Sequence, residues 1–229
     1  MGVRAAGVLR LGRRRFEPWQ LLVMAVAPGV GSGVGSGPAA EGGQTSIASD
    51  PAVAMEWVHS AVAEGADIVE LPGVHSVAPF VATVRDAYPE LVIGVRTGRG
   101  EVAREACAAG ADLLSGGGGL LFEVAAESGV GVVGSLTEAA RAVEAGVAPE
   151  RVMVEGSRQV ADLVASGWPV LVSLSDPDLA GDLARAAVFG WLGARVFRVQ
   201  RVRETRRALS MVSAIRGDIP PAYALRGLA

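Results

Sequence analysis

Short apolar runs alternate along the chain with longer segments in which apolar positions recur every three or four residues. Unbroken short runs are typical of parallel strands covered on both faces, and the longer spacing is typical of amphipathic helices. The predicted strands are Leu21–Ala27, Ile68–Leu71, Leu91–Arg96, Leu113–Ser115, Gly131–Gly134, Val152–Glu155, Val170–Ser175 and Arg195–Gln200. The predicted helices are Pro51–Glu64, Val77–Tyr88, Glu101–Ala109, Leu120–Ser128, Leu136–Ala145, Ser157–Ser166, Asp178–Leu192 and Val202–Arg216. This alternation predicts an α/β fold, a closed (β/α)8 TIM barrel, with a doubly wound open sheet as the alternative.

Glycines mark the ends of many predicted helices. The marks are Gly65, Gly110, Gly129, Gly146, Gly167 and Gly193, each followed at once by a predicted strand. Glycine after a helix adopts a left-handed conformation that other residues resist, so the marks indicate a repeated βα unit. No linker interrupts the series, and we expect a single domain over residues 1–229, opened by a short hairpin at Val8–Phe16.

A glycine-rich segment at 28–49 interrupts this regular alternation of strands and helices. It follows the first strand and contains the sequence GVGSGVGSG. A phosphate-binding loop would need a following Lys-Ser/Thr or a tight strand-to-helix turn, and neither is present. A flexible loop is the favoured interpretation.

Composition excludes several classes of function. Half of the residues are apolar, a fifth are charged and the net charge is −3, which indicates a large core and argues against a nucleic-acid surface. All basic side chains are arginine, and neither lysine nor asparagine occurs. A lysine Schiff base and an asparagine metal ligand are therefore excluded.

The sulfur and histidine content points to a reducing compartment. One cysteine, Cys107, allows no internal disulfide, and with two histidines it supplies too few ligands for a zinc cluster. Arg13–Arg15 followed by Leu21–Ala27 is the pattern of a secretory signal, but the apolar run is short and Glu17 and Pro18 intervene. No run reaches the length of a membrane span. We expect a cytoplasmic protein.

Candidate chemistry lies at the carboxyl ends of the predicted strands, where barrel enzymes place their working residues. These positions hold Glu70, Arg96, Thr97, Ser115, Ser135, Glu155, Ser175, Asp176, Arg198 and Gln200. Arginines bind phosphate or carboxylate through paired donors, so an anionic small molecule is one expected ligand. Alternatively, Arg96 neutralises Glu70 or Glu155. His75 is interpreted as a loop histidine.

Four segments in register resemble dihydropteroate synthase, the folate-pathway enzyme that joins a pterin pyrophosphate to p-aminobenzoate. They are Ala63–Glu70, Ile93–Ser115 against the family's ISVDTxxxEVAxxAxxAGADIIND, Pro169–Ser175 against PVLVGLSRK, and Phe197–Ile215 against VRVHDVxETxxALxxxxAI. The resemblance covers nearly the whole chain. It implies a (β/α)8 barrel, a dimer, and Mg²⁺ held by an asparagine of the first strand.

The differences from the family lie at the residues that bind its substrates and its metal. The first-strand asparagine is missing, so we expect no Mg²⁺ and no other cofactor or metal. The aspartate that holds the pterin ring becomes Arg96, which only donates hydrogen bonds, whereas Thr97 is kept. The pterin-contacting Asn-Asp becomes Ser115-Gly116, and the strand-six aspartate becomes Glu155. The turn after strand seven loses its lysine at Ser175-Asp176-Pro177, whereas Arg198 is kept on strand eight.

These exchanges lead to a functional hypothesis. Each lost buried hydrogen-bond partner costs about 1–3 kcal/mol, and several are lost together. We expect a barrel without the synthase reaction, acting as a non-catalytic homologue or partner subunit, either as a homodimer or with a related protein. The alternatives are an enzyme or receptor for another anionic molecule, and an active synthase with an unusual site. The candidate binding residues are Glu70, Arg96, Thr97, Ser115, Glu155, Ser175 and Arg198; no catalytic residue is assigned.

Overall fold

The computed structural model describes residues 7–27, 50–74 and 77–219. Eight parallel strands form a closed barrel in the ring order β10-β3-β4-β5-β6-β7-β8-β9. The pairing of β10 with β3 closes the ring, so the barrel prediction is confirmed and the open sheet is wrong. The predicted glycine-rich loop at 28–49 and His75 lie outside the described residues.

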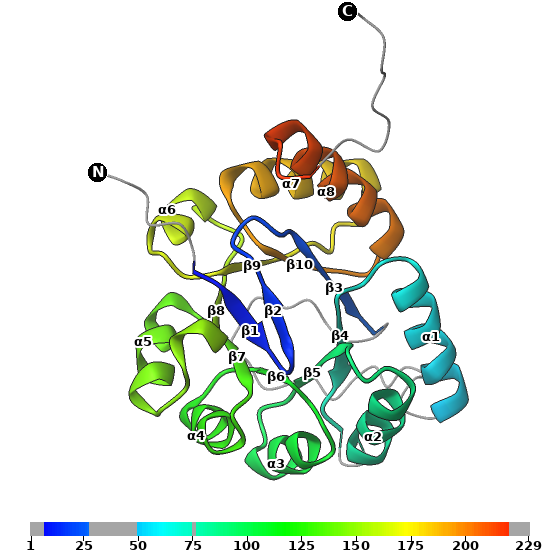
Figure 1. The fold of residues 1–229 in the computed structure, drawn as a ribbon, viewed down its shortest axis with the longest axis vertical. Helices are drawn as coiled ribbons and strands as arrows, with labels where there is room; N and C mark the ends of the chain where they lie inside the picture. Colours follow the sequence, from blue (N-terminus) through cyan, green and yellow to red (C-terminus); the bar gives the residue numbers. More distant parts are fainter. Residues whose placement is uncertain (1–6, 28–49, 75–76, 220–229) are drawn as a thin grey trace, which may run out of the picture.

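The strands and helices follow the predicted alternation (Figure 1). The barrel strands are β3 Leu22–Val26, β4 Ile68–Pro72, β5 Val92–Arg96, β6 Leu113–Ser115, β7 Gly131–Gly134, β8 Val152–Glu155, β9 Val170–Ser173 and β10 Val196–Val199. The helices are α1 Pro51–Ala63, α2 Val77–Ala87, α3 Gly100–Ala108, α4 Gly119–Ser128, α5 Leu136–Glu144, α6 Val160–Ala165, α7 Leu179–Leu192 and α8 Val202–Arg216, with a 3-10 turn η2 at Pro149–Arg151. Helices surround the strands on every side in the view along the barrel.

The six glycines predicted to end helices all have positive φ, between +64° at Gly129 and +107° at Gly110. Most predicted boundaries are within one residue of those in the structure, and two differ by more. The helix expected from Ser157 begins only at Val160, because Gln159 has a left-handed φ of 51° that a helix interior excludes. The strand expected to reach Ser175 ends at Ser173.

Alternation along the strands divides the core into two clusters. Residues such as Val69, Ile93 and Phe197 face the helices in the larger cluster. Their neighbours face the barrel axis in a second cluster: Leu9, Leu11, Phe16, Leu22, Met24, Ile68, Val92, Leu113, Val133, Met153, Leu171 and Val196. The barrel is therefore filled with side chains rather than hollow.

The predicted hairpin exists as β1 Leu9–Leu11 and β2 Arg14–Phe16, and it lies across the amino-terminal end of the barrel (Figure 1). Its apolar side chains belong to the axial cluster. Arg195, just before β10, is 1% exposed and donates to the carbonyl oxygens of Gly7 at 2.7 Å and Glu17 at 2.6 Å. Burial lowers the pKa of Arg195 to about 10. The hairpin thus closes one end of the barrel and leaves the carboxyl ends of the strands as the open mouth.

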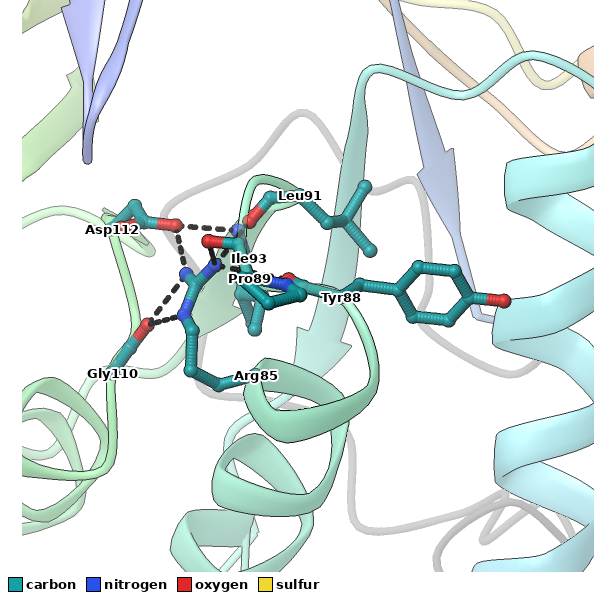
Figure 2. Close-up of polar contacts among 7 residues, drawn as sticks. All are labelled: Arg85, Tyr88, Pro89, Leu91, Ile93, Gly110 and Asp112. Carbon is teal, nitrogen blue, oxygen red and sulfur yellow. Dashed lines mark hydrogen bonds and ion pairs between the residues drawn. The ribbon is translucent and has the colours of Figure 1, made fainter.

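An arginine clamp repeats at the amino-terminal end of the strands. In Figure 2, Arg85 of α2 reaches the carbonyl oxygens of Gly110 and Leu91 and the carboxylate of Asp112 at 2.5 Å. Asp112 in turn accepts the backbone N–H of Ile93 at 2.9 Å. Burial raises the pKa of Asp112 even though these donors oppose the shift.

The second clamp has the same pattern. Arg206 of α8 donates to the Gly65 carbonyl and to the carboxylate of Asp67, which accepts the N–H of Val23 at 2.9 Å. In both clamps a Gly-Ala-Asp turn ties a helix end to two neighbouring strands. The two clamps thus link neighbouring strands at their amino-terminal ends, opposite the mouth.

Candidate functional site

A buried polar network replaces the apolar filling at the mouth of the barrel. Glu70, Ser115, Glu155, Ser173 and Arg198 stand at the carboxyl ends of β4, β6, β8, β9 and β10. Each lies two residues after a member of the axial cluster on its own strand, as Glu70 follows Ile68, so each points to the barrel axis.

Arg198 is the centre of this network. Its Nη2 lies 2.9 Å from Glu70 Oε1, and its Nη1 lies 2.5 Å from Glu155 Oε1. Arg198 is 2% exposed and Glu70 is fully buried, whereas Glu155 keeps 24% of its side chain exposed. Burial by itself would lower the pKa of Arg198, but the two carboxylates outweigh it and the pKa is raised. The guanidinium is therefore a permanent cation bound to two anions.

Two serines complete the network. Ser115 Oγ donates to Glu70 Oε1 at 2.6 Å, and Ser173 Oγ donates to Glu155 Oε1 at 2.9 Å. Ser173 Oγ also accepts from Arg198 Nη1 at 3.3 Å. Within the described part of the chain, Glu70 Oε2 and Arg198 Nε have no hydrogen-bond partner. The network is thus tightly connected on one side of each charged group.

The structure brings together four of the residues proposed from the sequence: Glu70, Ser115, Glu155 and Arg198. The sequence led us to propose that Arg96 pairs with Glu70 or Glu155. In the structure both carboxylates bind Arg198 instead. Arg96 is opposite Pro72 in the β4–β5 register, whereas Glu70 is opposite Gly94. Arg96 therefore stands two residues nearer the mouth than Glu70. There it lines a cavity of about 10 Å³ together with Ser175 and Arg198.

Thr97 lies outside the network. It is buried in the turn after β5, where its N–H donates to the Ser115 carbonyl at 2.8 Å and its Oγ1 accepts from the Arg99 N–H at 3.1 Å. Gly73 and Gly116 pack so closely against it that a Cβ would lie 2.4 Å and 2.2 Å from atoms of Thr97. The packing of Thr97 is thus a structural reason for these two glycines.

The other rim residues have separate contacts. Ser175 is exposed beyond the end of β9. Ser135 and Glu138 form the capping box of α5, and Asp176 pairs with Arg185 at 2.8 Å. Gln200 contributes to the lining of the small cavity and of a neighbouring cavity of about 250 Å³ between the β9–α7 loop and α8.

Ser173 was missed by the sequence reasoning. The signal was available: Leu171 and Ser173 are two residues apart on one strand, so they share a face. Because the strand was predicted to continue to Ser175, the mouth position was assigned to Ser175 instead.

Comparison with known proteins shows which family the chain is related to. No protein-family model matches the chain. The protein named inactive dihydropteroate synthase 2 of Mycobacterium tuberculosis is 36% identical, over 78% of this chain and 80% of the relative. The solved structure of Mycobacterium tuberculosis Rv1207 is also 36% identical, with a TM-score of 0.73 over 89% of this chain and 95% of that one.

More distant structures share the fold. A dihydropteroate synthase of Coxiella burnetii, solved in complex with pteroic acid, is 19% identical and superposes with a TM-score of 0.72 over 93% of this chain and 99% of that one. At this identity only the barrel is comparable. The matches at 36% identity show the family as well as the fold, because they extend over most of both chains. The chain therefore belongs to the dihydropteroate synthase family, and these relatives within it bear the name inactive dihydropteroate synthase 2.

Proposed function

We propose that this protein has lost the synthase reaction and acts as a non-catalytic homologue or partner subunit. The observation that carries the proposal is the occupation of Arg198 by Glu70 and Glu155. The family resemblance assigns this arginine to the pyrophosphate. Three of the five N–H donors of this guanidinium already bind Glu155, Ser173 and Glu70, and its charge is balanced by the two carboxylates, so a phosphate would have to compete with them for the buried cation. The name of the 36% identical relatives agrees with this proposal.

The small volume of the cavity and the hydrogen-bond donors at the mouth also disfavour the binding of a pterin. The cavity beside Arg198 that the described residues line has a volume of about 10 Å³, and the neighbouring cavity, which shares Ser175 and Gln200, has a volume of about 250 Å³. Small-molecule pockets usually measure about 300–1,000 Å³. Arg96 stands where the family has the ring-holding aspartate, and a guanidinium cannot accept the ring's N–H donors. Shape and hydrogen bonding thus disfavour the same ligand.

The residues do not suit the Mg²⁺ that the family implies. The first strand has no asparagine, and Glu70 and Glu155 are each bound to the charge of Arg198. A divalent cation would have to displace that guanidinium from a buried site. We therefore assign no metal step to this protein.

Titration calorimetry with pterin pyrophosphate, Mg²⁺ and p-aminobenzoate tests the proposal, together with chromatographic detection of pteroate. We expect no saturable binding and no pteroate, while an active dihydropteroate synthase gives both in the same assay. Complementation of a folate-auxotrophic host is expected to fail. Micromolar binding with pteroate formation would overturn the proposal.

The alternative of a receptor for another anion has a direct test. A thermal-shift screen of phosphorylated and carboxylated metabolites should show no stabilisation that depends on Arg96 or Arg198 if the mouth is neutralised internally. A shift that is lost in Arg96→Ala and in Arg198→Ala would instead assign the mouth to an anionic ligand.

We propose that a barrel without its reaction acts through association, and the lone cysteine and the net charge of −3 suit a cytoplasmic protein complex without nucleic acid. Within the described residues no helix is long and apolar enough to cross a membrane. We propose that the association is a homodimer or a complex with a related subunit.

A further inference from the structure

A larger cavity lies at the amino-terminal end of the barrel, on the opposite side from the mouth. Its volume is about 590 Å³, within the range of about 300–1,000 Å³ that small-molecule sites occupy. The hairpin, the turn that contains η2 and the segment between α6 and β9 supply its walls. This space, here called the hairpin cavity, is lined by Arg10, Arg15, Pro149, Glu150, Ser166 and Trp168 together with their neighbours.

Buried contacts hold the walls of the hairpin cavity in place. Gly7 lies at its edge, and the Gly7 carbonyl accepts a hydrogen bond of 2.7 Å from Arg195, which is itself buried. Trp168 is half-buried and packs against the helix-facing core cluster. The cavity is therefore preformed, and a ligand that enters it has little protein to order.

The hairpin concentrates positive charge on an otherwise acidic chain. Its residues 8–17 contain four arginines and one glutamate, a net charge of +3, whereas the whole chain has −3. Arg10 is directly opposite Arg15 in the β1–β2 register, and both are exposed where they line the cavity. Like charges in this relationship destabilise a hairpin. An anion between the two guanidiniums would remove that repulsion.

The carboxylates near these two arginines leave them accessible to a ligand. Arg15 pairs with Glu17 at 3.0 Å, but both side chains are exposed, and such surface pairs contribute little to stability. Among the described residues Arg10 has no ion-pair partner. Glu150 is the one carboxylate in the lining itself. The guanidinium pair is therefore available to an anion at small cost.

The rest of the lining suits a flat ring with polar substituents. Trp168 offers an indole, and Pro149 and Pro169 add apolar surface beside it. Flat heterocycles stack on indole rings with little regard to their exact pattern of donors and acceptors. Glu150 and Ser166 can accept hydrogen bonds from the amino or hydroxyl groups of a ligand. The cavity thus combines a cationic pair, a stacking surface and acceptors.

We propose that the hairpin cavity binds a nucleoside monophosphate, with the phosphate on Arg10 and Arg15 and the base on Trp168. A phosphate of nearly two negative charges matches two guanidiniums, whereas a monocarboxylate would neutralise only one. The volume admits one nucleotide and not a nucleic-acid strand, which agrees with the acidic net charge. The site lies at the end of the barrel opposite Arg198, so the inference goes beyond the proposed function and does not depend on it.

Titration calorimetry of the full chain with AMP and GMP as probes tests the proposal. We expect saturable binding at one site per chain. Arg10→Gln with Arg15→Gln should weaken the binding about 30-fold or more, because the phosphate loses both of its forked donors. Arg104→Gln with Arg207→Gln is the matched control. It removes the same charge from exposed arginines of α3 and α8, outside the cavity lining, and should leave the affinity within about threefold.

Parts of the ligand separate the two contacts. Adenosine tests the ring and inorganic phosphate tests the anion, and each should bind at least about tenfold more weakly than AMP. Trp168→Leu should weaken AMP binding about tenfold and leave inorganic phosphate unaffected, whereas Trp168→Phe keeps a stacking surface and most of the affinity. Inorganic phosphate that binds as tightly as AMP, or phenylacetate that binds more tightly, would show that the ligand class is wrong.

Hydrogen exchange of the wild type with saturating AMP locates the site without any variant, so the test stands even where a variant does not fold. Protection of residues 7–16 and 166–169 supports the proposal, and protection confined to the carboxyl ends of the strands contradicts it. A wild type that binds neither nucleotide, or an Arg10/Arg15 double variant that binds as tightly as the wild type, also overturns it. The pteroate assay is independent, so failure here leaves the proposed loss of synthase activity standing.

Discussion

Arg198 and Glu70 form a salt bridge of 2.9 Å inside the barrel, with 2% and 0% of their side chains exposed. Two charges this deeply buried are costly to separate, because neither can recover its hydration in place. The stability of the barrel therefore depends on this ion pair at the carboxyl ends of the strands. A side chain that the family resemblance assigns to the substrate has become part of the core.

Removing one partner should be far worse than removing both. Arg198→Met leaves Glu70 as a buried carboxylate without a counter-ion and with only the Ser115 hydroxyl as a donor, and we expect a loss of about 3–5 kcal/mol in the free energy of unfolding. Arg198→Met with Glu70→Leu should cost clearly less than Arg198→Met alone, since the charge is removed with its partner. Urea denaturation of the wild type, both single variants and the double variant measures the coupling. Additive losses would show that the two side chains act independently.

The fold could be read from the sequence because its signals are local. Unbroken apolar strands and the glycines at Gly65, Gly110 and Gly193 follow from backbone and burial rules that act within a few residues. The starting point of α6 could not be read in this way, because the left-handed Gln159 is set by its surroundings rather than by its own preference.

The candidate site could be predicted only as a set of positions. Glu70, Glu155 and Arg198 were all expected at the mouth, but their pairing depends on the stagger of strands that are distant in sequence. The β4–β5 register sets Arg96 two residues beyond the level of Glu70 and leaves that carboxylate to Arg198. The arginine clamps escaped prediction for the same reason: Arg206 and Asp67 are 139 residues apart.

The Arg85 clamp should contribute strongly to stability. Arg85→Met removes the donors to four backbone carbonyls, and it leaves the carboxyl of Asp112, whose pKa is raised by burial, with only the Ile93 N–H. We expect a loss of about 2–4 kcal/mol in unfolding free energy. Arg104→Met, at an exposed arginine of α3, is the control and should change stability by less than about 0.5 kcal/mol. Similar effects from the two substitutions would argue that the clamp is not a structural element.

The hairpin formed by β1 and β2 packs against Gly131 and should leave no room for a side chain there. A Cβ there would lie 2.6 Å from Leu11 Cδ2 and 3.0 Å from the Arg151 carbonyl oxygen. Gly131→Ala is therefore expected to destabilise the protein by about 1–3 kcal/mol. Gly98→Ala, where nothing lies within 4 Å of the new Cβ, should be close to neutral in the same denaturation assay.

Removing the nearest obstacle tests the cause of this effect. In the Leu11→Ala background, Gly131→Ala should cost less than in the wild type, because the added methyl group enters the space that Leu11 vacates. An undiminished cost would shift the cause from the hairpin contact to the backbone of Arg151.

The capping box of α5 should give stability a defined dependence on pH. Glu138 Oε2 accepts the Ser135 N–H and hydroxyl at 2.8 Å each, and the backbone bond from Ser135 is the largest cause that lowers the pKa of Glu138 below its ordinary 4.5. The unfolded chain then binds the proton more readily than the folded one. The charged cap stabilises the fold fully above pH 4.5, and this contribution is lost as the pH falls through the lower pKa of the folded state.

Glu138→Gln should be less stable than the wild type by about 0.5–1 kcal/mol at neutral pH, and the difference should shrink on acidification. Thermal unfolding across the acidic range checks this sign. In a Ser135→Ala background the pH-dependent part should be smaller, because one donor to the carboxylate is gone; a gap between Glu138→Gln and the wild type that stays constant with pH would leave the capping charge without a role.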